Sequence, residues 1–251
     1  VAVAIFSLPN REVATSTFLL NLFMFHEYFG VAHVDGVYWT LTLELAFYFW
    51  ILVVFCMRQI KNIEKILIVW ITAATILTFY KFDFPIGPKL QKFLLLDFIE
   101  LFSAGICFYK YKTKTHSKLT SIVLALSILT LFFSYSLKGA VALCGFYFVF
   151  WLIINNKAPM LGNKLLVYLG TISYSLYLVH QNIGYMIINK SYLYGFDPLL
   201  GMLFAFALSV GLSHLILVYI ERPSLISLRQ FYKTNNKVRL LRNKLGFDNN
   251  N

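Results

Sequence analysis

The sequence has little charge: Asp, Glu, Lys and Arg make up only 13% of its 251 residues, while 59% are hydrophobic and the mean hydropathy is +0.70. A soluble domain carries about 25% charged residues, so this composition excludes an ordinary soluble protein. Cysteine is also scarce. The three cysteines lie inside apolar segments at no metal-ligand spacing, and we expect neither disulfides nor a bound metal.

Acidic residues are half as frequent as basic ones, 11 against 22, which gives a formal net charge of +11. No basic helix face interleaved with aromatic residues accompanies this charge, so we expect no nucleic-acid partner. The basic residues lie instead in short loops and in the C-terminal tail, which is the distribution that membrane topology produces.

Long apolar windows predict an all-α fold, a polytopic membrane helix bundle of about seven transmembrane helices. An apolar stub precedes them and a basic, Asn-rich tail follows. We therefore expect a membrane domain over residues 1–223 and a tail over residues 224–251. The predicted spans are 38–57, 64–80, 92–109, 119–135, 138–154, 167–188 and 198–219.

Lys and Arg are unequally divided between alternate loops. One side of the membrane holds 16 of the 22, and the other side holds the remaining 6. By the positive-inside rule the richer side is cytoplasmic. This predicts a multi-pass protein of the cell membrane (a bacterial plasma or inner membrane) with a cytoplasmic C-terminus. Residues 8–37 then form an outer loop, in which we expect His26 and His33 to be solvated.

The few ionisable residues within the apolar windows gather at one depth. At about 1.5 Å per helical residue, Glu44, Asp97, Glu100 and His180 lie roughly 7 to 12 Å below the outer ends of their segments. An unpartnered charge at that depth is costly, so we expect these side chains to face the bundle interior or a water-filled cavity.

Each of these residues lies on a polar stripe at i, i+3 or i+4 spacing. A histidine near carboxylates can act as a general base, whereas a static hydrogen-bonded pair that fixes helix packing is the alternative. For the four residues together we favour a functional role. The stripes are Thr40, Glu44 and Tyr48; Asp97, Glu100, Ser103 and Cys107; and Ser173, Tyr177, His180 and Gly184.

Several sequence elements resemble the membrane acyltransferase-3 family. Trp39–Tyr48, WTLTLELAFY, is similar to that family's W-S-L-x-x-E-x-x-F-Y signature, with Thr40 at the usual Ser position. Ser173–His180, SYSLYLVH, resembles its S-Y-x-x-Y-L-x-H element. Glu221–Pro223 is similar to its closing turn, and Phe102–Gly105 fits its middle. The elements occur in the family's order and extend over nearly the whole chain.

The resemblance implies a ten-helix membrane fold, of which this chain corresponds to the fourth to tenth helices. It also implies transfer of an acyl group, usually acetyl, from cytoplasmic acyl-CoA to a hydroxyl of an extracytoplasmic carbohydrate or lipid-linked glycan, without a bound cofactor. The family's pair of a basic residue and a His on its first helix has no counterpart here, and the chain begins at Val1 within an apolar run. We therefore expect an N-terminally truncated fragment.

The resemblance also implies roles for individual residues. Glu44 and His180 would be catalytic, orienting or activating the attacking hydroxyl. The basic loops, Lys110–Lys118 foremost, could meet the CoA phosphates. The substrate-binding residues would be Trp39, Thr40, Tyr48, Asp97, Glu100, Ser173, Tyr174 and Tyr177.

Two other functions fit the same residues. A proton-coupled transporter of a small solute or lipid-linked sugar would use the buried carboxylates and histidine as coupling groups. Transporter sites usually lie near the midplane on broken helices, whereas here all six prolines lie in loops or at helix ends. The other possibility is a catalytically inactive remnant that only occupies the membrane.

Overall fold

The computed structural model describes residues 14–79 and 87–235, which form helices and connecting turns without any strand. This confirms the all-α prediction. The chain divides into two compact units, each treated by itself below. The α3–α8 unit comprises Phe23–Val31 and Trp39–Asn163, and the α9–α11 unit comprises the described parts of Val1–Leu22, Ala32–Tyr38 and Lys164–Asn251.

Four helical segments in the described part of the chain are long and apolar enough to cross a membrane. They overlap four of the predicted spans, although Pro198–Thr234 extends beyond the predicted end at residue 219, and a fifth apolar helix, Lys118–Ser134, is shorter. A helical membrane bundle is therefore confirmed, and the number of seven spans stays a prediction. The four segments are Tyr38–Cys56, Ile60–Phe79, Leu137–Ile154 and Pro198–Thr234.

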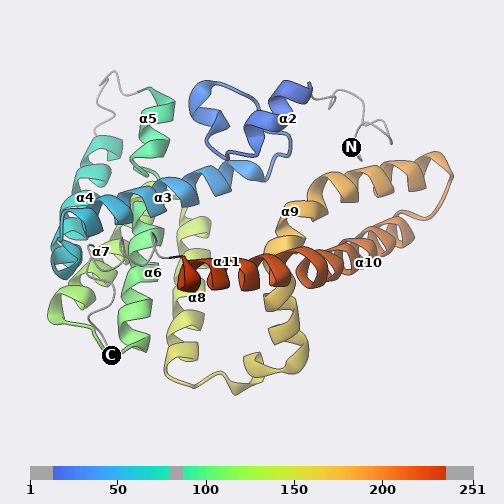
Figure 1. The fold of residues 1–251 in the computed structure, drawn as a ribbon. Helices are drawn as coiled ribbons and strands as arrows, with labels where there is room; N and C mark the ends of the chain where they lie inside the picture. The colour runs from blue at the N-terminus through green and yellow to red at the C-terminus, as the bar shows by residue number, and fades with distance from the viewer. Residues whose placement is uncertain (1–13, 80–86, 236–251) are drawn as a thin grey trace. The chain divides into compact units, whose positions relative to one another are not determined.

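The α3–α8 unit is built around three helices that pack against one another, α4 (Ile63–Phe79), α6 (Ile99–Lys112) and α7 (Lys118–Ser134) (Figure 1). Helix α3 (Tyr38–Cys56) contributes to the same buried core, and α8 (Leu137–Ile154) packs on α6 and α7. Helices α3, α4, α6 and α7 all contribute side chains to this core. Examples are Leu43, Leu67, Ile71, Ile99 and Val123, each less than 5% exposed.

The predicted span 92–109 is not one helix. A short helix, α5 (Pro88–Phe93), ends at a turn over residues 94–98, and α6 begins after it. Leu95 lies in this turn with a left-handed φ of 56°. A break of this kind leaves backbone carbonyls without intrahelical partners, which is expensive in an apolar environment.

Two indoles supply the missing partners at this break. Trp50 Nε1 donates to Phe93 O at 2.8 Å, and Trp70 Nε1 donates to Leu94 O at 2.9 Å. The two indole rings also contact each other edge to face, with centroids 5.7 Å apart. Helices α3 and α4 therefore stabilise the turn between α5 and α6 through their tryptophans.

Segment 23–31, predicted to belong to an outer loop, is part of the α3–α8 unit and carries a short 3-10 helix, η1 (His26–Phe29). It is held by Lys92, which forms an ion pair with Glu27, and by Thr42, whose hydroxyl donates to Met24 O at 3.2 Å. His26 is only 2% exposed, so the prediction of a solvated side chain is wrong for this residue. The segment folds back onto the helices and encloses the imidazole.

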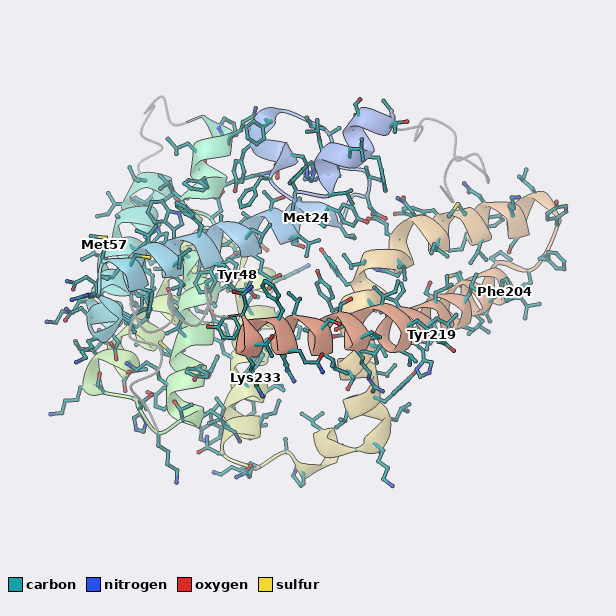
Figure 2. All side chains as sticks on the ribbon, in the orientation of Figure 1. Met24, Tyr48, Met57, Phe204, Tyr219 and Lys233 are labelled. Carbon is teal, nitrogen blue, oxygen red and sulfur yellow. The ribbon has the colours of Figure 1, made fainter. Side chains whose placement is uncertain are left out.

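In the α9–α11 unit, α10 (Pro198–Ile216) packs along α9 (Lys164–Leu193). Helix α10 continues through a π-helical turn, η4 (Leu217–Glu221), into α11 (Arg222–Thr234). Figure 2 labels Phe204, Tyr219 and Lys233 along this continuous rod. The predicted boundary at residue 223 thus falls within a helix.

Small residues recur every four positions on the buried face of α10. At Gly201 the two helices lie close together: a Cβ added there would lie 2.8 Å from Ser191 Cβ. Small residues at this spacing allow membrane helices to pack with their backbones close together. The stripe consists of Gly201, Ala205, Ser209 and Ser213.

Candidate functional site

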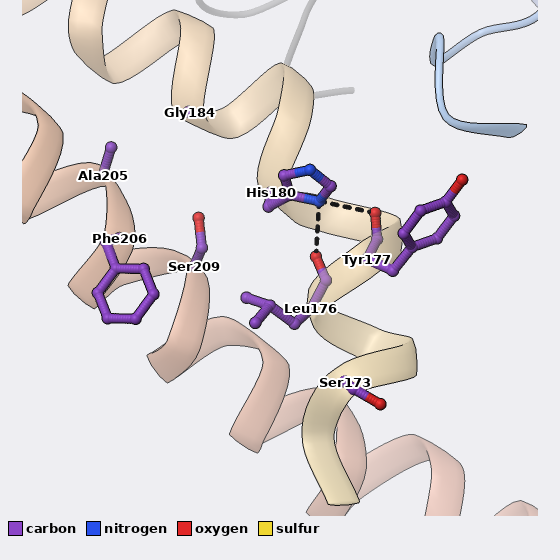
Figure 3. Close-up of a pocket in the computed structure, with 8 residues that line it drawn as sticks. All are labelled: Ser173, Leu176, Tyr177, His180, Gly184, Ala205, Phe206 and Ser209. Carbon is purple, nitrogen blue, oxygen red and sulfur yellow. Dashed lines mark hydrogen bonds between the residues drawn. The ribbon is translucent and has the colours of Figure 1, made fainter. Parts of the chain in front are cut away.

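A cavity of about 430 Å³ lies between α9 and α10 (Figure 3). Four residues that the sequence pattern places on one face of α9 all line it: Ser173, Tyr177, His180 and Gly184. Helix α10 contributes Ser209, whose hydroxyl lies on the side of α10 toward His180. The prediction that this stripe faces a cavity is confirmed, while the catalytic and substrate-binding roles of its members stay predictions.

The hydrogen bonds of His180 determine its tautomer. Its Nδ1 lies 2.9 Å from Tyr177 O and 3.1 Å from Leu176 O (Figure 3). Carbonyl oxygens only accept, so Nδ1 carries the hydrogen, and in the neutral ring the lone pair is on Nε2. No described residue donates to Nε2. The imidazole is exposed within its unit and can therefore accept a proton from a ligand through Nε2.

Tyr177 connects α9 to the loop of residues 32–38. Its hydroxyl donates to Val37 O at 2.6 Å, and its ring points away from α10 (Figure 3). Asn182, one turn further along α9, donates to Val34 O at 3.3 Å. The Tyr177 hydroxyl is thus occupied by the segment that leads into Trp39 in the sequence.

The other side of this loop is anchored on α2 (Thr15–Asn21). Asn21, 3% exposed, donates to Ala32 O and accepts from Val34 N, each at 3.0 Å. The loop is therefore fixed by side chains on both flanks, although it has no regular secondary structure of its own.

A partly buried hydrogen bond joins two of the elements that carry the family resemblance. Ser175, 1% exposed, donates through Oγ to Glu221 Oε2 at 2.9 Å. Glu221 is the last residue of η4, and π-helical turns often mark functional positions. The sequence pattern named both elements without pairing them, because the contact depends on how α9 and α10 pack.

Glu44 lies half-buried on α3, where it accepts a hydrogen bond from the Tyr48 hydroxyl one turn later. This contact confirms that the two residues share a face. Tyr48 is 55% exposed and Trp39 is 37% exposed, with its ring centroid 5.8 Å from that of Phe98. Thr40 is half-buried in the first turn of the same helix.

Glu100 lies in the first turn of α6 and is only 2% exposed. Its main-chain carbonyl accepts from Ser127 Oγ at 2.6 Å and from Tyr147 OH at 3.3 Å. Its Oε1 has no hydrogen-bond partner among the described residues, and neither does the nearby buried hydroxyl of Ser103. Asp97 precedes the helix and accepts from Gln91 Nε2 at 2.7 Å.

The predicted site residues are divided between the two units. Glu44, Asp97 and Glu100 belong to the α3–α8 unit, and His180 belongs to the α9–α11 unit. The convergence of these four residues stays a prediction. Tyr174, 52% exposed, is not among the described residues that line the α9–α10 cavity. Ser209 and Ser127 are polar neighbours of these residues that lie outside the predicted stripes.

Comparison with known families identifies the chain over most of its length. The family model described as an acyltransferase domain, of the acyltransferase-3 type, matches residues 1–218. No curated protein and no solved structure matches the chain.

Proposed function

Because this chain belongs to the acyltransferase-3 family, we propose that it is a membrane-bound O-acyltransferase. The proposed donor is cytoplasmic acyl-CoA, with acetyl as the acyl group. The proposed acceptor is a hydroxyl of an extracytoplasmic carbohydrate or a lipid-linked glycan. No bound cofactor takes part in the proposed reaction.

The observation that carries this proposal is the tautomer of His180 at a cavity. With Nδ1–H held by two carbonyls, Nε2 is the atom that removes the proton of the acceptor hydroxyl. The hydroxyl oxygen then forms a bond to the thioester carbonyl carbon, the C–S bond breaks, and the imidazolium returns the proton to the departing thiolate. Each proton and electron pair is accounted for without a further reactant.

The proposed part of Glu44 is to orient or activate the acceptor hydroxyl. Its hydrogen bond with Tyr48 keeps the carboxylate on a defined face of α3. Trp39, Tyr48 and Tyr174 expose aromatic surface on which a sugar ring can stack. Asp97, Glu100 and Ser173 are proposed as polar contacts for sugar hydroxyls.

The test is acyl transfer to surface glycans in cells that express the full-length gene product. Replacing His180 by Ala should lower the acetyl content of the glycans by a factor of about 100 or more, the usual contribution of a general base. His214→Ala is the matched control, because His214 is an exposed histidine on α10 that contacts Tyr168 at 3.1 Å and lies outside the cavity lining.

Glu44→Gln, which keeps the size of the side chain, should also lower the acetyl content. Protein amounts in the membrane are measured in parallel by immunoblot. Unchanged acetylation in both the His180 and the Glu44 variants, at normal protein amounts, would show that the assigned site is wrong.

One observation favours a transporter as the second candidate. The helix is interrupted between α5 and α6, and interrupted helices are common at transporter sites. A transporter would move a glycan or solute without changing its mass. Mass spectrometry of the glycans therefore separates the two functions, and an inactive remnant would change neither mass nor distribution.

A further inference from the structure

A second cavity, of about 580 Å³, lies at the end of the α3–α8 unit where α6 and α8 finish. This is the end predicted to be cytoplasmic. The cavity has an apolar, largely aromatic wall and a rim of basic and amide side chains. The wall is formed by Phe108, Tyr111, Leu124, Trp151 and Ile154, and the rim by Lys112, Lys114, His116, Asn155 and Asn156.

The rim is electropositive because it carries Lys112 and Lys114 and none of its described residues is acidic. The acidic residue near the end of α6 is Glu64, and its carboxylate is already engaged by three donors. Lys110 forms an ion pair with it, and the hydroxyls of Ser117 and Thr120 donate to it at 3.3 and 3.2 Å. Glu64 therefore does not neutralise Lys112 and Lys114.

The lysines are not needed to satisfy the carbonyls at the ends of the two helices. Helix α6 ends with Lys114 at a φ of 57°, and Thr115 N donates back to Lys110 O at 2.9 Å. Helix α8 ends in the same way, with Asn156 at a φ of 55° and Lys157 N donating to Leu152 O at 2.8 Å. Backbone N–H groups thus satisfy carbonyls at both helix ends, as they generally do where a helix ends in a left-handed residue.

Positive-inside topology explains how many lysines lie on this side of the membrane, but not their arrangement around a cavity. The rim combines two loops about 40 residues apart in the sequence, at residues 112–116 and 155–156. Aromatic rings support both: His116 stacks on Tyr111 with centroids 4.8 Å apart, and Lys157 Nζ lies 4.8 Å from the Trp151 ring centre.

We propose that this cavity binds a phosphate group. The ammonium groups of Lys112 and Lys114 and the amide of Asn156 supply hydrogen-bond donors, while the aromatic wall accepts the apolar or ring portion attached to the phosphate. Two sources carry this chemistry. One is an anionic phospholipid headgroup, reached beside the exposed face of α8 with Phe148 and Phe150; the other is a soluble phosphate ester.

The soluble source rests on the proposed function, because the loop Lys110–Lys118 is also the one expected to meet the CoA phosphates, whereas the lipid source does not. Binding is measured without acyl transfer, so the site and the proposed function can fail separately. The test measures binding to the purified full-length protein in detergent. Native mass spectrometry counts bound phosphatidylglycerol against phosphatidylcholine, and thermophoresis measures the affinity for ADP as the soluble probe. The pocket variant is Lys112→Gln with Lys114→Gln. The control is Lys61→Gln with Lys65→Gln, which removes the same charge from exposed lysines outside the cavity lining.

We expect the pocket variant to weaken binding of one probe by about 25-fold, because each lysine near an anionic headgroup contributes roughly fivefold. The control should change it by less than about threefold. Loss of phosphatidylglycerol alone identifies a lipid source, and loss of ADP alone identifies a soluble source.

Ile154→Trp fills the cavity without changing the charge and should also abolish binding. If the pocket variant and the control variant weakened binding equally, diffuse surface charge would explain the binding and the proposal would be overturned. The same holds if neither probe binds the wild-type protein, or if Ile154→Trp binds normally at an unchanged melting temperature.

Discussion

The carboxylate of Glu64 joins three helices of the α3–α8 unit, and its removal should be costly. Glu64 lies in the first turn of α4. Its carboxylate forms an ion pair with Lys110 of α6 and accepts hydrogen bonds from the hydroxyls of Ser117 and Thr120 at the start of α7. The side chains of Lys110 and Glu64 are only 19% and 8% exposed. Truncating one partner of such a pair leaves a largely buried, uncompensated charge, which costs about 3–5 kcal/mol.

A double-mutant cycle tests this directly. Glu64→Leu and Lys110→Met should each lower the free energy of unfolding by about 3–5 kcal/mol, whereas the double variant should lose much less than the sum. Lys65→Met is the control, since Lys65 is exposed on the same helix, and its effect should stay within about 0.5 kcal/mol. Unfolding in mixed micelles can be followed by the fluorescence of Trp50 and Trp70, which lie in this unit.

The expected coupling free energy is about 3 kcal/mol, since the double variant leaves neither charge behind. Strictly additive losses would refute the argument, because they would mean that Lys110 does not compensate Glu64. Single variants as mild as the Lys65 control would refute it as well, by showing that water reaches the pair.

Three further outcomes can be measured on the same preparation. Trp70→Phe removes the donor to a backbone carbonyl at the α5–α6 turn and should cost about 1–3 kcal/mol in micelle unfolding; a loss below 0.5 kcal/mol, roughly the noise of surface changes, would contradict it. Gly201→Val should lower the melting temperature, because any Cβ there meets Ser191 at 2.8 Å; an unchanged value would show that the helices separate freely. Burial first, and then the Glu27 carboxylate, raise the pKa of Tyr28 to about 12. The stabilisation linked to its neutral phenol is therefore complete below pH 10, the ordinary value, and is lost as the pH rises through about 12; an absorbance titration that shows every tyrosine ionising near pH 10 would contradict this.

The apolar windows predicted most helices because a long uncharged run has few alternatives to a membrane helix. The ends of α3, α7 and α8 lie within one residue of the predicted spans. The break before α6 could not be predicted in this way. Most residues of the turn are apolar, and the groups that stabilise it are indoles of Trp50 and Trp70, far away in the sequence.

The candidate site was predictable to the extent that helical periodicity determines it. Spacing alone placed Ser173, Tyr177, His180 and Gly184 on one face, and that face lines a cavity. The tautomer of His180 was not predictable, since it depends on which carbonyls its ring meets. The contribution of α10 could have been predicted from its small residues at every fourth position. The predicted stripes were built around ionisable residues, and this face of α10 has none near the cavity.

The shortness of α6 has a consequence for the helices around it. Its 14 residues rise about 21 Å, against a hydrocarbon thickness of about 30 Å. The backbone groups at the ends of so short a helix need hydrogen-bond partners within the protein, because lipid offers none. Helices α4, α7 and α8 all pack against α6 and are each longer, so α6 depends on its neighbours for a polar environment at its ends.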